Sequence, residues 1–464
     1  MLDFERKTEL FVEKHVLFKK DDFIIVAVSG GPDSMAMLDF LVKRQDQYGV
    51  TLVVAHVDHM LRGEESLRDL EYVKNYCAST GLIFKAESID IKSKMKKDKT
   101  GLQETARVYR YQFLEQVMEE FQANKLVVGQ HGDDQIETIL MRLTRGSREI
   151  SRAGIQVKRK FGNGELIRPL LGVSKSEIEE YCKVKALHPR RDESNDKPTY
   201  TRNRFRLDIL PFLKEENSRV HEQFQRFSEE ITEDEKYLRF LAKEQMEKMC
   251  QEFDGVEIRL NISLFKQVPL PLQRRGIHLI LNYLYQQYAP DLSALHIDLI
   301  QQLIKSKKPS GRIDLPNGLK VIRSYEQCNF TFTELEQASG FYYVLEEDND
   351  LLLPNQLTIR MEKNTDNNLK DQDNVLIFDP NTIQFPIIVR TRRPGDRMKI
   401  KGMNGSKKVK NIFMEMKIPL QDRRNWPIIT DNSGQILWIP GLKKSCYNTS
   451  PNKEHIYYSI HYSK

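Results

Sequence analysis

Short runs of apolar residues alternate with longer amphipathic segments in the first part of the chain. The runs predict buried parallel strands at 23–28, 51–55, 82–84 and 125–128. The segments between them have helical length and composition, near 34–47, 64–79 and 103–121. Strand–helix alternation of this kind predicts right-handed crossovers and a doubly wound parallel sheet. Such sheets bind ligands at the carboxyl ends of their strands, where Ser29, His56 and His131 fall.

After the first 220 residues or so, the apolar positions recur at helical spacing. One stripe lies within 224–241 and another within 292–304, and stripes of this kind usually form a packed core. Pro and Gly at 309–311 and 316–318 punctuate short strand-like runs, which predicts a closing hairpin. Residues 345–374 are polar and acidic, as in exposed connections, and the chain after them is rich in short strands.

These patterns predict a doubly wound α/β domain, a helical middle domain and a β-rich α+β C-terminal domain. The boundaries that we expect are 1–215 for the first domain, 216–340 for the mainly helical one, 341–380 for a connecting segment and 381–464 for the last. A chain of 464 residues has room for about two to four domains of ordinary size.

Basic residues are concentrated in two stretches that lie far apart in the sequence. The formal net charge of +6 is by itself too small to indicate a nucleic-acid-binding protein. Between residues 390 and 424, however, there are 12 Lys and Arg against 3 Asp and Glu, and between 183 and 206 there are 8 against 3. Two such clusters are typical of a protein that binds an extended polyanion, although two solvated surface segments give the same counts.

Neither the apolar residues nor the cysteines indicate export or membrane insertion. No apolar run approaches the roughly 18 residues of a transmembrane helix, and the charged start of the chain lacks the apolar core of a signal peptide. The five cysteines are scattered and include no CxxC pair, which argues against a disulfide framework, a zinc ribbon or an iron–sulfur cluster. We therefore expect a soluble cytoplasmic protein without a membrane partner.

The sharpest candidate site is a loop between a buried strand and a helix, made of Ser29, Gly30, Gly31, Pro32, Asp33 and Ser34. Glycines allow the backbone to approach phosphates closely, and hydroxyls and helix-start amides donate hydrogen bonds to them. The loop matches neither the Walker A pattern nor GxGxxG. A carboxylate beside phosphates is repulsive unless a metal ion or a cationic group lies between them, which makes Asp33 informative. An ordinary capped turn is the simpler alternative.

A second cluster follows the fourth strand and contains His131, Asp133, Asp134 and Glu137. The two aspartates suit the positive end of a helix dipole, and Glu137 lies one turn later. Three carboxylates around one helix start can bind Mg²⁺ or the ammonium group of a substrate. One acid is enough to cap a helix, so three acids with a histidine favour a site over a cap.

Other polar residues are expected at the same edge of the sheet. His56 and Asp58 follow the second strand, where doubly wound folds commonly bind a ribose or a base. Arg107 and Arg110 lie on a predicted helix, and phosphate contact and simple solvent exposure are equally good interpretations of them.

The loop SGGPDS resembles the pyrophosphate-binding loop of the ATP pyrophosphatases, which adenylate a carbonyl oxygen and release pyrophosphate. Together with AHVDHMLRG, QETARVYRY and GQHGDDQIETILMRLTRG, it resembles the tRNA(Ile)-lysidine synthetases specifically. The segment 192–206 and a tail with TRRPGDRM, GSKKVKNIFMEMKIP and DNSGQILWIPG are similar to that family too. The resemblance covers most of the chain and is weakest in the helical middle and the acidic connections.

The resemblance implies a reaction and its partners. ATP would adenylate the 2-carbonyl oxygen of the wobble cytidine in an isoleucine tRNA with a CAU anticodon, with Mg²⁺ present. The ε-amine of free L-lysine would then displace AMP and form lysidine. The first domain would be the catalytic PP-loop domain, and the middle and last domains would contact tRNA. The resemblance also suggests a homodimer, although no segment of the sequence demands one.

The resemblance also assigns roles to residues. The ATP site would consist of Ser29, Gly30, Gly31, Pro32, Asp33, Ser34, His56 and Asp58. The catalytic residues would be Asp33, Arg107, His131, Asp133, Asp134 and Glu137. The acids of the second cluster would hold lysine or help to deprotonate it, and Asp33 and Asp133 would bind Mg²⁺. The tRNA contacts would be Arg190 and Arg191, then Arg202, Asn203, Arg204 and Arg206 at the anticodon loop, and Arg392, Arg393, Arg397, Lys407, Lys408 and Lys410 along the backbone.

Three other functions fit parts of the pattern. A sibling tRNA sulfur transferase would use the same adenylation loop, but most such enzymes need a cysteine pair that the spacing here does not offer. An amidating synthetase acting on a small molecule would leave both basic clusters unexplained. A non-catalytic tRNA-binding protein would have no reason to keep the carboxylates near the loop.

Overall fold

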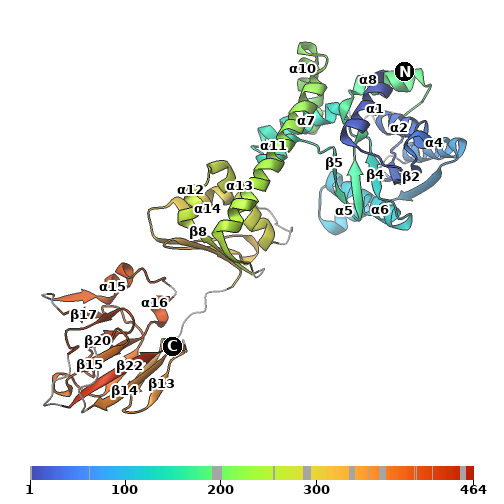
Figure 1. Cartoon of the computed structure of the whole chain (residues 1–464). Helices are drawn as coiled ribbons and strands as arrows, with labels where there is room; N and C mark the ends of the chain where they lie inside the picture. The colour runs from blue at the N-terminus through green and yellow to red at the C-terminus, as the bar shows by residue number, and fades with distance from the viewer. Residues whose placement is uncertain are drawn as a thin grey trace. The chain divides into compact units, whose positions relative to one another are not determined.

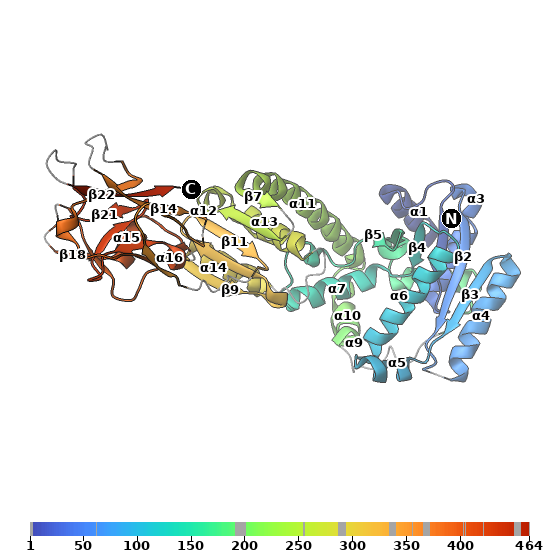
Figure 2. The same cartoon turned by 90° about the horizontal axis from the view of Figure 1, so that it is seen from below.

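The computed structural model describes residues 3–61, 63–190, 201–253, 256–285, 294–333, 340–354, 356–364, 372–401, 403, 405–420, 422–449 and 456–463. The chain divides into two compact units, Met1–Leu238 and Arg239–Lys464. Figures 1 and 2 show the elements of each unit from two directions.

The first unit is built on a six-stranded sheet with the order β3-β2-β1-β4-β6-β5. Its strands are β1 (Phe23–Ala27), β2 (Thr51–Asp58), β3 (Ile83–Ser88), β4 (Lys125–Val128), β5 (Lys158–Phe161) and β6 (Gly164–Ile167). Neighbouring strands pair in parallel, except that β5 forms an antiparallel hairpin with β6 at the edge. The predicted doubly wound parallel sheet is confirmed, and the hairpin is an addition that the apolar runs did not indicate.

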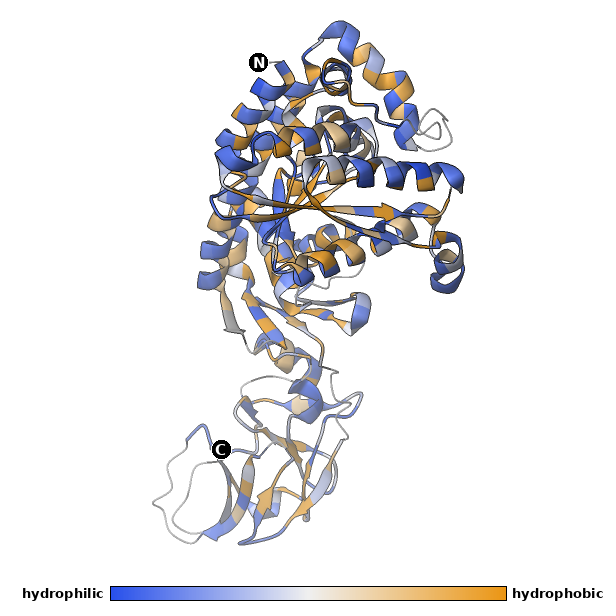
Figure 3. Cartoon of the chain, turned by 90° about the vertical axis from the view of Figure 1, so that its right-hand side faces the viewer, coloured by the Kyte–Doolittle hydropathy of each residue, from blue (hydrophilic) through white to orange (hydrophobic). Residues whose placement is uncertain are grey.

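Helices cover both faces of this sheet. They are α1 (Asp3–His15), α2 (Pro32–Val42), α3 (Gln45–Tyr48), α4 (Glu64–Thr80), α5 (Ile91–Asp98), α6 (Leu102–Glu120), α7 (Gly132–Thr144) and α8 (Lys175–Val184). Apolar side chains of α1, α2, α4 and α8 pack on one face, around Ile24 and Val26. Those of α6 pack on the other face, around Ile25 and Val53. Alternate residues of β1 therefore enter opposite layers, and Figure 3 shows mostly apolar strands between helices with polar outer surfaces.

A series of helices ends the first unit. α9 (Thr201–Arg204) continues into a π-helical turn, η4 (Phe205–Ile209), and then into α10 (Leu210–Glu216). Ile136 of α7 packs against Leu210 and Val220, which attaches these helices to the sheet domain. α11 (Val220–Met249) follows and contains the division between the two units. No helix in the described ranges is both long and apolar enough to cross a membrane, and α11 carries charged residues along its whole length.

The second unit begins with a five-stranded antiparallel sheet of order β7-β8-β11-β10-β9. Its elements are β7 (Cys250–Phe253), β8 (Glu257–Asn261), α12 (Ile262–Gln267), α13 (Leu270–Leu284), α14 (Ala294–Lys305), β9 (Ser310–Asp314), β10 (Lys320–Ser324) and β11 (Gln327–Thr331). The expected hairpin is formed by β9 and β10. The sheet itself was not predicted, because strands such as β8 bury only alternate residues, here Ile258 and Leu260, and give no continuous apolar run.

Two further antiparallel sheets, β12-β16-β19-β20-β21 and β13-β14-β22-β15, share an apolar core in the C-terminal part. The elements are β12 (Tyr342–Leu345), β13 (Asp350–Leu352), β14 (Thr358–Asn364), β15 (Val375–Phe378), β16 (Ile387–Arg390), β17 (Arg397–Lys399), β18 (Ser406–Lys408), α15 (Val409–Glu415), α16 (Asp422–Asn425), β19 (Ile428–Thr430), β20 (Ile436–Ile439), β21 (Lys443–Lys444) and β22 (Tyr457–Ser463). The expectation of a mere connecting segment over 341–380 does not hold, because that stretch supplies β12 to β15. In β14, Ile359 and Met361 are buried while Arg360 is exposed. The exposed charged residues between the buried ones make this strand look like a polar segment in the sequence.

Candidate active site

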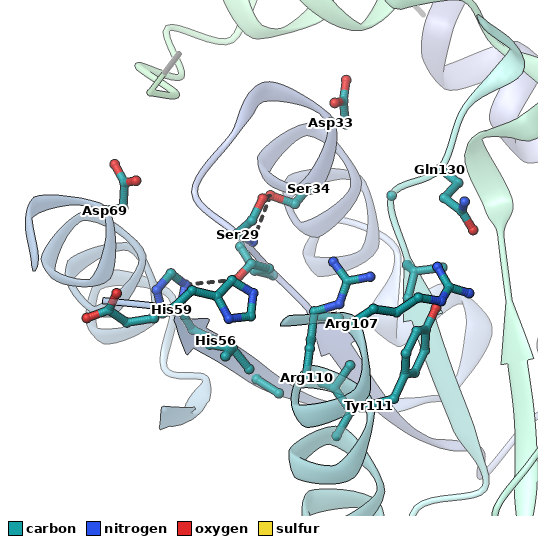
Figure 4. A pocket seen from close by; sticks show the side chains of 18 of the residues that line it. Ser29, Asp33, Ser34, His56, His59, Asp69, Arg107, Arg110, Tyr111 and Gln130 are labelled. Atoms are coloured by element: carbon teal, nitrogen blue, oxygen red, sulfur yellow. Dashed lines mark hydrogen bonds between the residues drawn. The ribbon is translucent and has the colours of Figure 1, made fainter. Parts of the chain in front are cut away.

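A cavity of about 590 Å³ opens at the carboxyl ends of β1, β2 and β4 (Figure 4). The polar residues that line it include Ser29, Asp33, Ser34, His56, Asp58, His59, Asp69, Arg107, Arg110, Tyr111, Gln130, Asp134, Arg202, Asn203 and Arg206. Residues that follow three different strands therefore meet at one edge of the sheet, together with residues from α4, α6 and the segment 202–206.

The loop after β1 is shaped by the hydroxyl of Ser34. This hydroxyl accepts a hydrogen bond from the N–H of Ser29 at 3.1 Å and donates one to the carbonyl of Gly31 at 3.0 Å. Gly30 has a φ of 86°, a left-handed conformation that favours glycine. α2 begins at Pro32. Proline has no backbone N–H, but an N–H in the first turn of a helix has no partner within the helix, so no helical hydrogen bond is lost. The loop therefore has the build of a phosphate-binding loop at a helix N-terminus.

Asp33 lines the cavity with a side chain that is 30 % exposed. Its Oδ1 accepts a hydrogen bond from Nζ of Lys175 in α8 at 2.6 Å, and Nε2 of His131 lies 3.8 Å from the same oxygen. Sequence reasoning missed Lys175 because it lies 142 residues further along the chain and belongs to no motif. A carboxylate beside a phosphate loop fits a Mg²⁺ ion that takes most of its ligands from phosphates and water. Within the described ranges no group of three or more His, Cys, Asp and Glu side chains is placed to hold a metal ion by itself.

The acids that were predicted at the start of α7 face different neighbours. Asp134 lines the cavity, whereas Asp133 is buried outside its lining, and its Oδ2 accepts a hydrogen bond from Nζ of Lys214 in α10 at 2.5 Å. Successive residues of a helix project about 100° apart, so the two side chains cannot share one direction. Like Glu137 and His131, Asp133 is not among the residues that line the cavity, and its role as a catalytic acid or a metal ligand stays a prediction.

Asp134 and Glu137 are joined to two arginines in a closed network. Nε of Arg202 donates to Glu137 Oε2 at 2.6 Å, and its Nη2 donates to Asp134 Oδ1 at 2.8 Å. Nε of Arg206 donates to Glu137 Oε1 at 2.7 Å. The side chain of Glu137 is fully buried, so its charge requires these partners. Arg202 and Arg206, which were predicted to contact tRNA, use their guanidinium groups inside the site.

The network sets protonation states around α7. Burial opposes ionisation of Asp134, but its interactions with His131, Arg202 and Arg206, which include a hydrogen bond from the backbone N–H of His131, outweigh it and hold the pKa of this carboxyl below its ordinary value. Burial likewise opposes the charges of Arg202 and Arg206, and the two carboxylates overcome it and raise the pKa of both arginines. A carboxylate with a lowered pKa is a weak base, so Asp134 suits the binding of a cation better than the removal of a proton.

Two histidines from the end of β2 form another wall. Nδ1 of His56 lies 2.9 Å from the carbonyl of Val28, which can only accept, so this nitrogen carries the proton. Burial lowers the pKa of His56, and burial with the nearby Arg110 lowers the pKa of His59 to about 4. Both rings are therefore neutral at pH 7. His56 and Asp58 belong to β2 itself, which runs further than the predicted strand.

Arginines from α6 make the third wall positive. In Figure 4, Arg107 and Arg110 rise from α6 toward the cavity, and their guanidinium carbons lie 5.0 and 5.3 Å from the centre of the Tyr111 ring. Burial would raise the pKa of Tyr111, but Arg110, Arg107 and Arg168 more than offset it and lower this pKa. Nε of Arg168 donates to Gln130 at 2.5 Å. The sequence pattern indicated Arg107, and Tyr111 ends the same motif, QETARVYRY, but nothing in the pattern indicated Arg168, which meets Tyr111 only in the fold.

The other tRNA contacts that were predicted between residues 190 and 204 are spread over several positions. Arg190 lies against the loop after β1, where its N–H donates to the carbonyl of Gly30. Asn203 is buried and lines the cavity, whereas Arg204 is exposed and lies outside the lining. Arg191 lies outside the described residues.

In the C-terminal part, the predicted basic contacts that are exposed are Arg392, Arg393, Arg397, Lys408 and Lys410. Two of the predicted contacts have internal partners. Arg397 donates to Ser406 across the β17–β18 hairpin, and Lys407 pairs with Glu415 at 2.6 Å. Arg392, Arg393, Lys408 and Lys410 are thus better placed for a phosphate backbone than Lys407.

Comparison with known proteins agrees with this geometry. Residues 1–213 match the family model of the PP-loop domain, 260–328 match the TilS substrate binding domain, and 387–460 match the TilS substrate C-terminal domain. The fold and the phosphate loop thus define an ATP-binding protein of the PP-loop class.

Similar proteins show to which family of this class the chain belongs. The tRNA(Ile)-lysidine synthase of Bacillus cereus is 45% identical over 468 residues, which cover 99% of this chain and 97% of that protein. That of Geobacillus kaustophilus is 44% identical over 457 residues and 98% of each chain. The chain therefore belongs to the tRNA(Ile)-lysidine synthase family. A crystal structure of the TILS C-terminal domain is 40% identical and covers 27% of this chain and 97% of its own, with a TM-score of 0.26.

Proposed function

We propose that this chain ligates L-lysine to the wobble cytidine of an isoleucine tRNA with a CAU anticodon. The cytidine 2-carbonyl oxygen attacks the α-phosphorus of ATP and releases pyrophosphate, and the lysine ε-amine then displaces AMP to form lysidine. The observation that carries the proposal is that a phosphate loop, an acidic helix start and a wall of arginines meet at one cavity in a chain of this family.

In the adenylation step, the loop amides and the hydroxyl of Ser29 bind the ATP phosphates, while the hydroxyl of Ser34 holds the shape of the loop. Asp33 would hold a Mg²⁺ ion, which offsets phosphate charge when it is bound. Arg107 and Arg110 stabilise the negative charge that develops as pyrophosphate leaves, because positive groups in a fixed position need little reorganisation. The neutral rings of His56 and His59 offer uncharged hydrogen-bonding groups to the nucleoside.

In the lysine step, Asp134 and Glu137 bind the side-chain ammonium group. Their network already holds as many positive as negative charges, so the incoming ammonium must replace one guanidinium. Arg202 has the more exposed side chain of the two arginines, at 40% against 32%, and is the one that we expect to leave. Nε2 of His131 lies 3.4 Å from Asp134, and in its neutral form this imidazole is placed to take the proton that the amine must lose before it attacks.

The polyanionic substrate is bound by groups outside this network. Asn203 at the cavity and the exposed Arg204 contact the anticodon loop, and the exposed basic residues of the C-terminal part contact the phosphate backbone. We extend the proposal to a homodimer, and sedimentation analysis at micromolar concentration tests that part.

A tRNA sulfur transferase is disfavoured by the positions of the cysteines. No cysteine is among the cavity-lining residues of the described structure. Burial raises the pKa of Cys77 and of Cys182 to about 11, so neither thiol is ionised at pH 7.

The release of AMP and pyrophosphate from ATP tests the proposal. We expect pyrophosphate only when unmodified CAU-anticodon tRNA is present, and full turnover to AMP only when lysine is added as well. Equal cleavage of ATP without tRNA would contradict the proposal and favour a small-molecule synthetase. Absence of cleavage under all conditions would favour a tRNA-binding protein without catalysis.

A further inference from the structure

Arg190 belongs to a basic stretch that suggests tRNA contact, yet its own contacts are to the phosphate loop. Its N–H donates to the carbonyl of Gly30 at 3.1 Å. Its Nε lies 2.7 Å from Oδ1 of Asp69 in α4, a carboxylate that lines the cavity and whose side chain is only 7% exposed. Gly30 and Asp69 are themselves adjacent, since a Cβ at position 30 would lie 3.5 Å from Cβ of Asp69. Loop, buried acid and arginine thus form one contact group.

The residues just before Arg190 also contact α4. A backbone hydrogen bond of His188 reaches the hydroxyl of Tyr72, which lies one turn after Asp69 in α4. Leu187 packs against the apolar core beneath the loop. Residues 187–190, which we call the strap, are therefore held in place by α4 and the core before Arg190 meets Gly30.

This arrangement has two consequences for a bound triphosphate. Gly30 and Gly31 leave the loop backbone with wide conformational freedom, and an external hydrogen bond to the Gly30 carbonyl restricts it. Asp69 places a buried negative charge beside the phosphate site, and the guanidinium of Arg190 neutralises it. Without Arg190, Asp69 loses the guanidinium that lies 2.7 Å from its Oδ1, and its negative charge acts more strongly on the phosphates that the loop must bind.

We propose that Arg190 is a positioning residue for ATP and not a tRNA contact. It neutralises Asp69 and, with the strap, holds the phosphate loop in its binding conformation. This inference rests on the proposed use of ATP in the cavity, and it adds a role to a residue that no motif of the loop includes.

The test compares Arg190→Ala with Arg190→Lys and with Arg204→Ala, an exposed arginine of the same basic stretch. Each variant is measured for the KM of ATP, for binding of Mg–ATP without tRNA, and for tRNA affinity at several salt concentrations. We expect R190A to raise the KM of ATP about tenfold with little change in kcat, which is the scale of one charged hydrogen bond. R190K should recover most of this loss, because a lysine ammonium still neutralises Asp69. R204A should show the reverse, with weaker tRNA binding and unchanged ATP binding.

The Asp69→Asn background shows whether Arg190 acts through the carboxylate. Once Asp69 is neutral, R190A should change the KM of ATP by less than about twofold, because coupled residues are not additive. Fully additive effects would overturn the inference. So would an R190A protein that binds ATP normally while its tRNA affinity and salt dependence fall. If R190A does not fold, R190K and D69N, which keep a side chain at each position, carry the test. Wild-type protein that binds ATP but transfers no lysine would contradict the proposed function and leave this inference intact.

Discussion

At the scale of single residues, two neighbouring acids of α7 have separate tasks. Asp133 is buried and pairs with Lys214 of α10, whereas Asp134 lines the cavity and pairs with Arg202. The first attaches a neighbouring helix to α7, and the second offers a negative charge to a substrate. Substitution at the two positions should therefore differ in its effect on lysine transfer.

We expect Asp134→Asn to lower lysine transfer by about 100-fold or more, because a binding charge in the cavity is lost, and also to lower the free energy of unfolding by about 1–3 kcal/mol, because Arg202 loses a charged partner. Asp133→Asn should lower the free energy of unfolding by a similar amount, because Lys214 loses a charged partner, but should leave lysine transfer by the folded protein largely unchanged. Urea unfolding and lysine-transfer rates measured on both variants check this pair. A D133N protein of unchanged stability that has lost lysine transfer would show that Asp133 belongs to the reaction.

The sequence was informative wherever site residues are consecutive. Residues 29–34 and 131–137 were predicted because a strand end and the next helix start fix their spacing. Lys175 and Lys214 were not predicted, since each meets its carboxylate only through the tertiary fold. The pairing of Arg202 and Arg206 with the acids was missed for the same reason, because a run of arginines looks the same whether it faces solvent or a buried carboxylate.

At the scale of elements, the carboxylate of Glu229 joins α11 to α1 by hydrogen bonds. Glu229 of α11 accepts hydrogen bonds from Lys14 at 2.6 Å and from His15 at 2.8 Å. Burial would raise the pKa of Glu229, but the hydrogen bonds from His15 and Lys14 outweigh it and lower this pKa from 4.5 to about 2. An acid whose pKa is lower in the folded protein than in the unfolded chain stabilises the fold at every pH above the unfolded-chain pKa. This contribution is lost as the pH falls through the pKa of the folded protein.

The difference in unfolding free energy between wild type and Glu229→Gln should consequently be constant above the ordinary pKa of 4.5 and disappear as the pH falls toward 2. Urea unfolding of both proteins at several pH values from about 2 to 7 measures this difference in free energy. A difference that stays the same at every pH would mean that the carboxylate charge is not what joins α1 to α11.

The predictability of elements follows from how they bury side chains. β1, β2 and β4 are buried on both faces and give continuous apolar runs, so the parallel sheet could be predicted. The hairpin β5–β6 and the sheets of the second unit bury alternate residues, as Ile359 and Met361 of β14 illustrate. In a segment rich in charged residues, this burial of every second residue is easily taken for a polar connecting segment.

At the scale of the whole molecule, the proposed reaction requires two binding functions in one chain. The first unit holds the reaction cavity, and the C-terminal part carries exposed arginines and lysines. Phosphate contacts of this kind release counterions and make affinity depend on salt.

Replacement of both Arg392 and Arg393 by Ala should weaken tRNA binding and lower the slope of log affinity against log salt by about two, one unit for each phosphate contact. Filter binding at several salt concentrations measures this slope. Arg360→Ala is a matched control, because Arg360 is exposed in β14 and pairs with Glu362 at 2.9 Å. Unchanged tRNA binding with reduced stability in the double variant would make these arginines structural.

The proposed reaction joins lysine to a base of the tRNA. The most direct measurement is the incorporation of labelled lysine into unmodified CAU-anticodon isoleucine tRNA with ATP and Mg²⁺, followed by mild alkali. We predict label that survives alkali, because a base-linked amine is stable where an aminoacyl ester is hydrolysed. Absence of stable label, with ATP still cleaved when tRNA is present, would contradict lysine as the nucleophile and leave only the adenylation step.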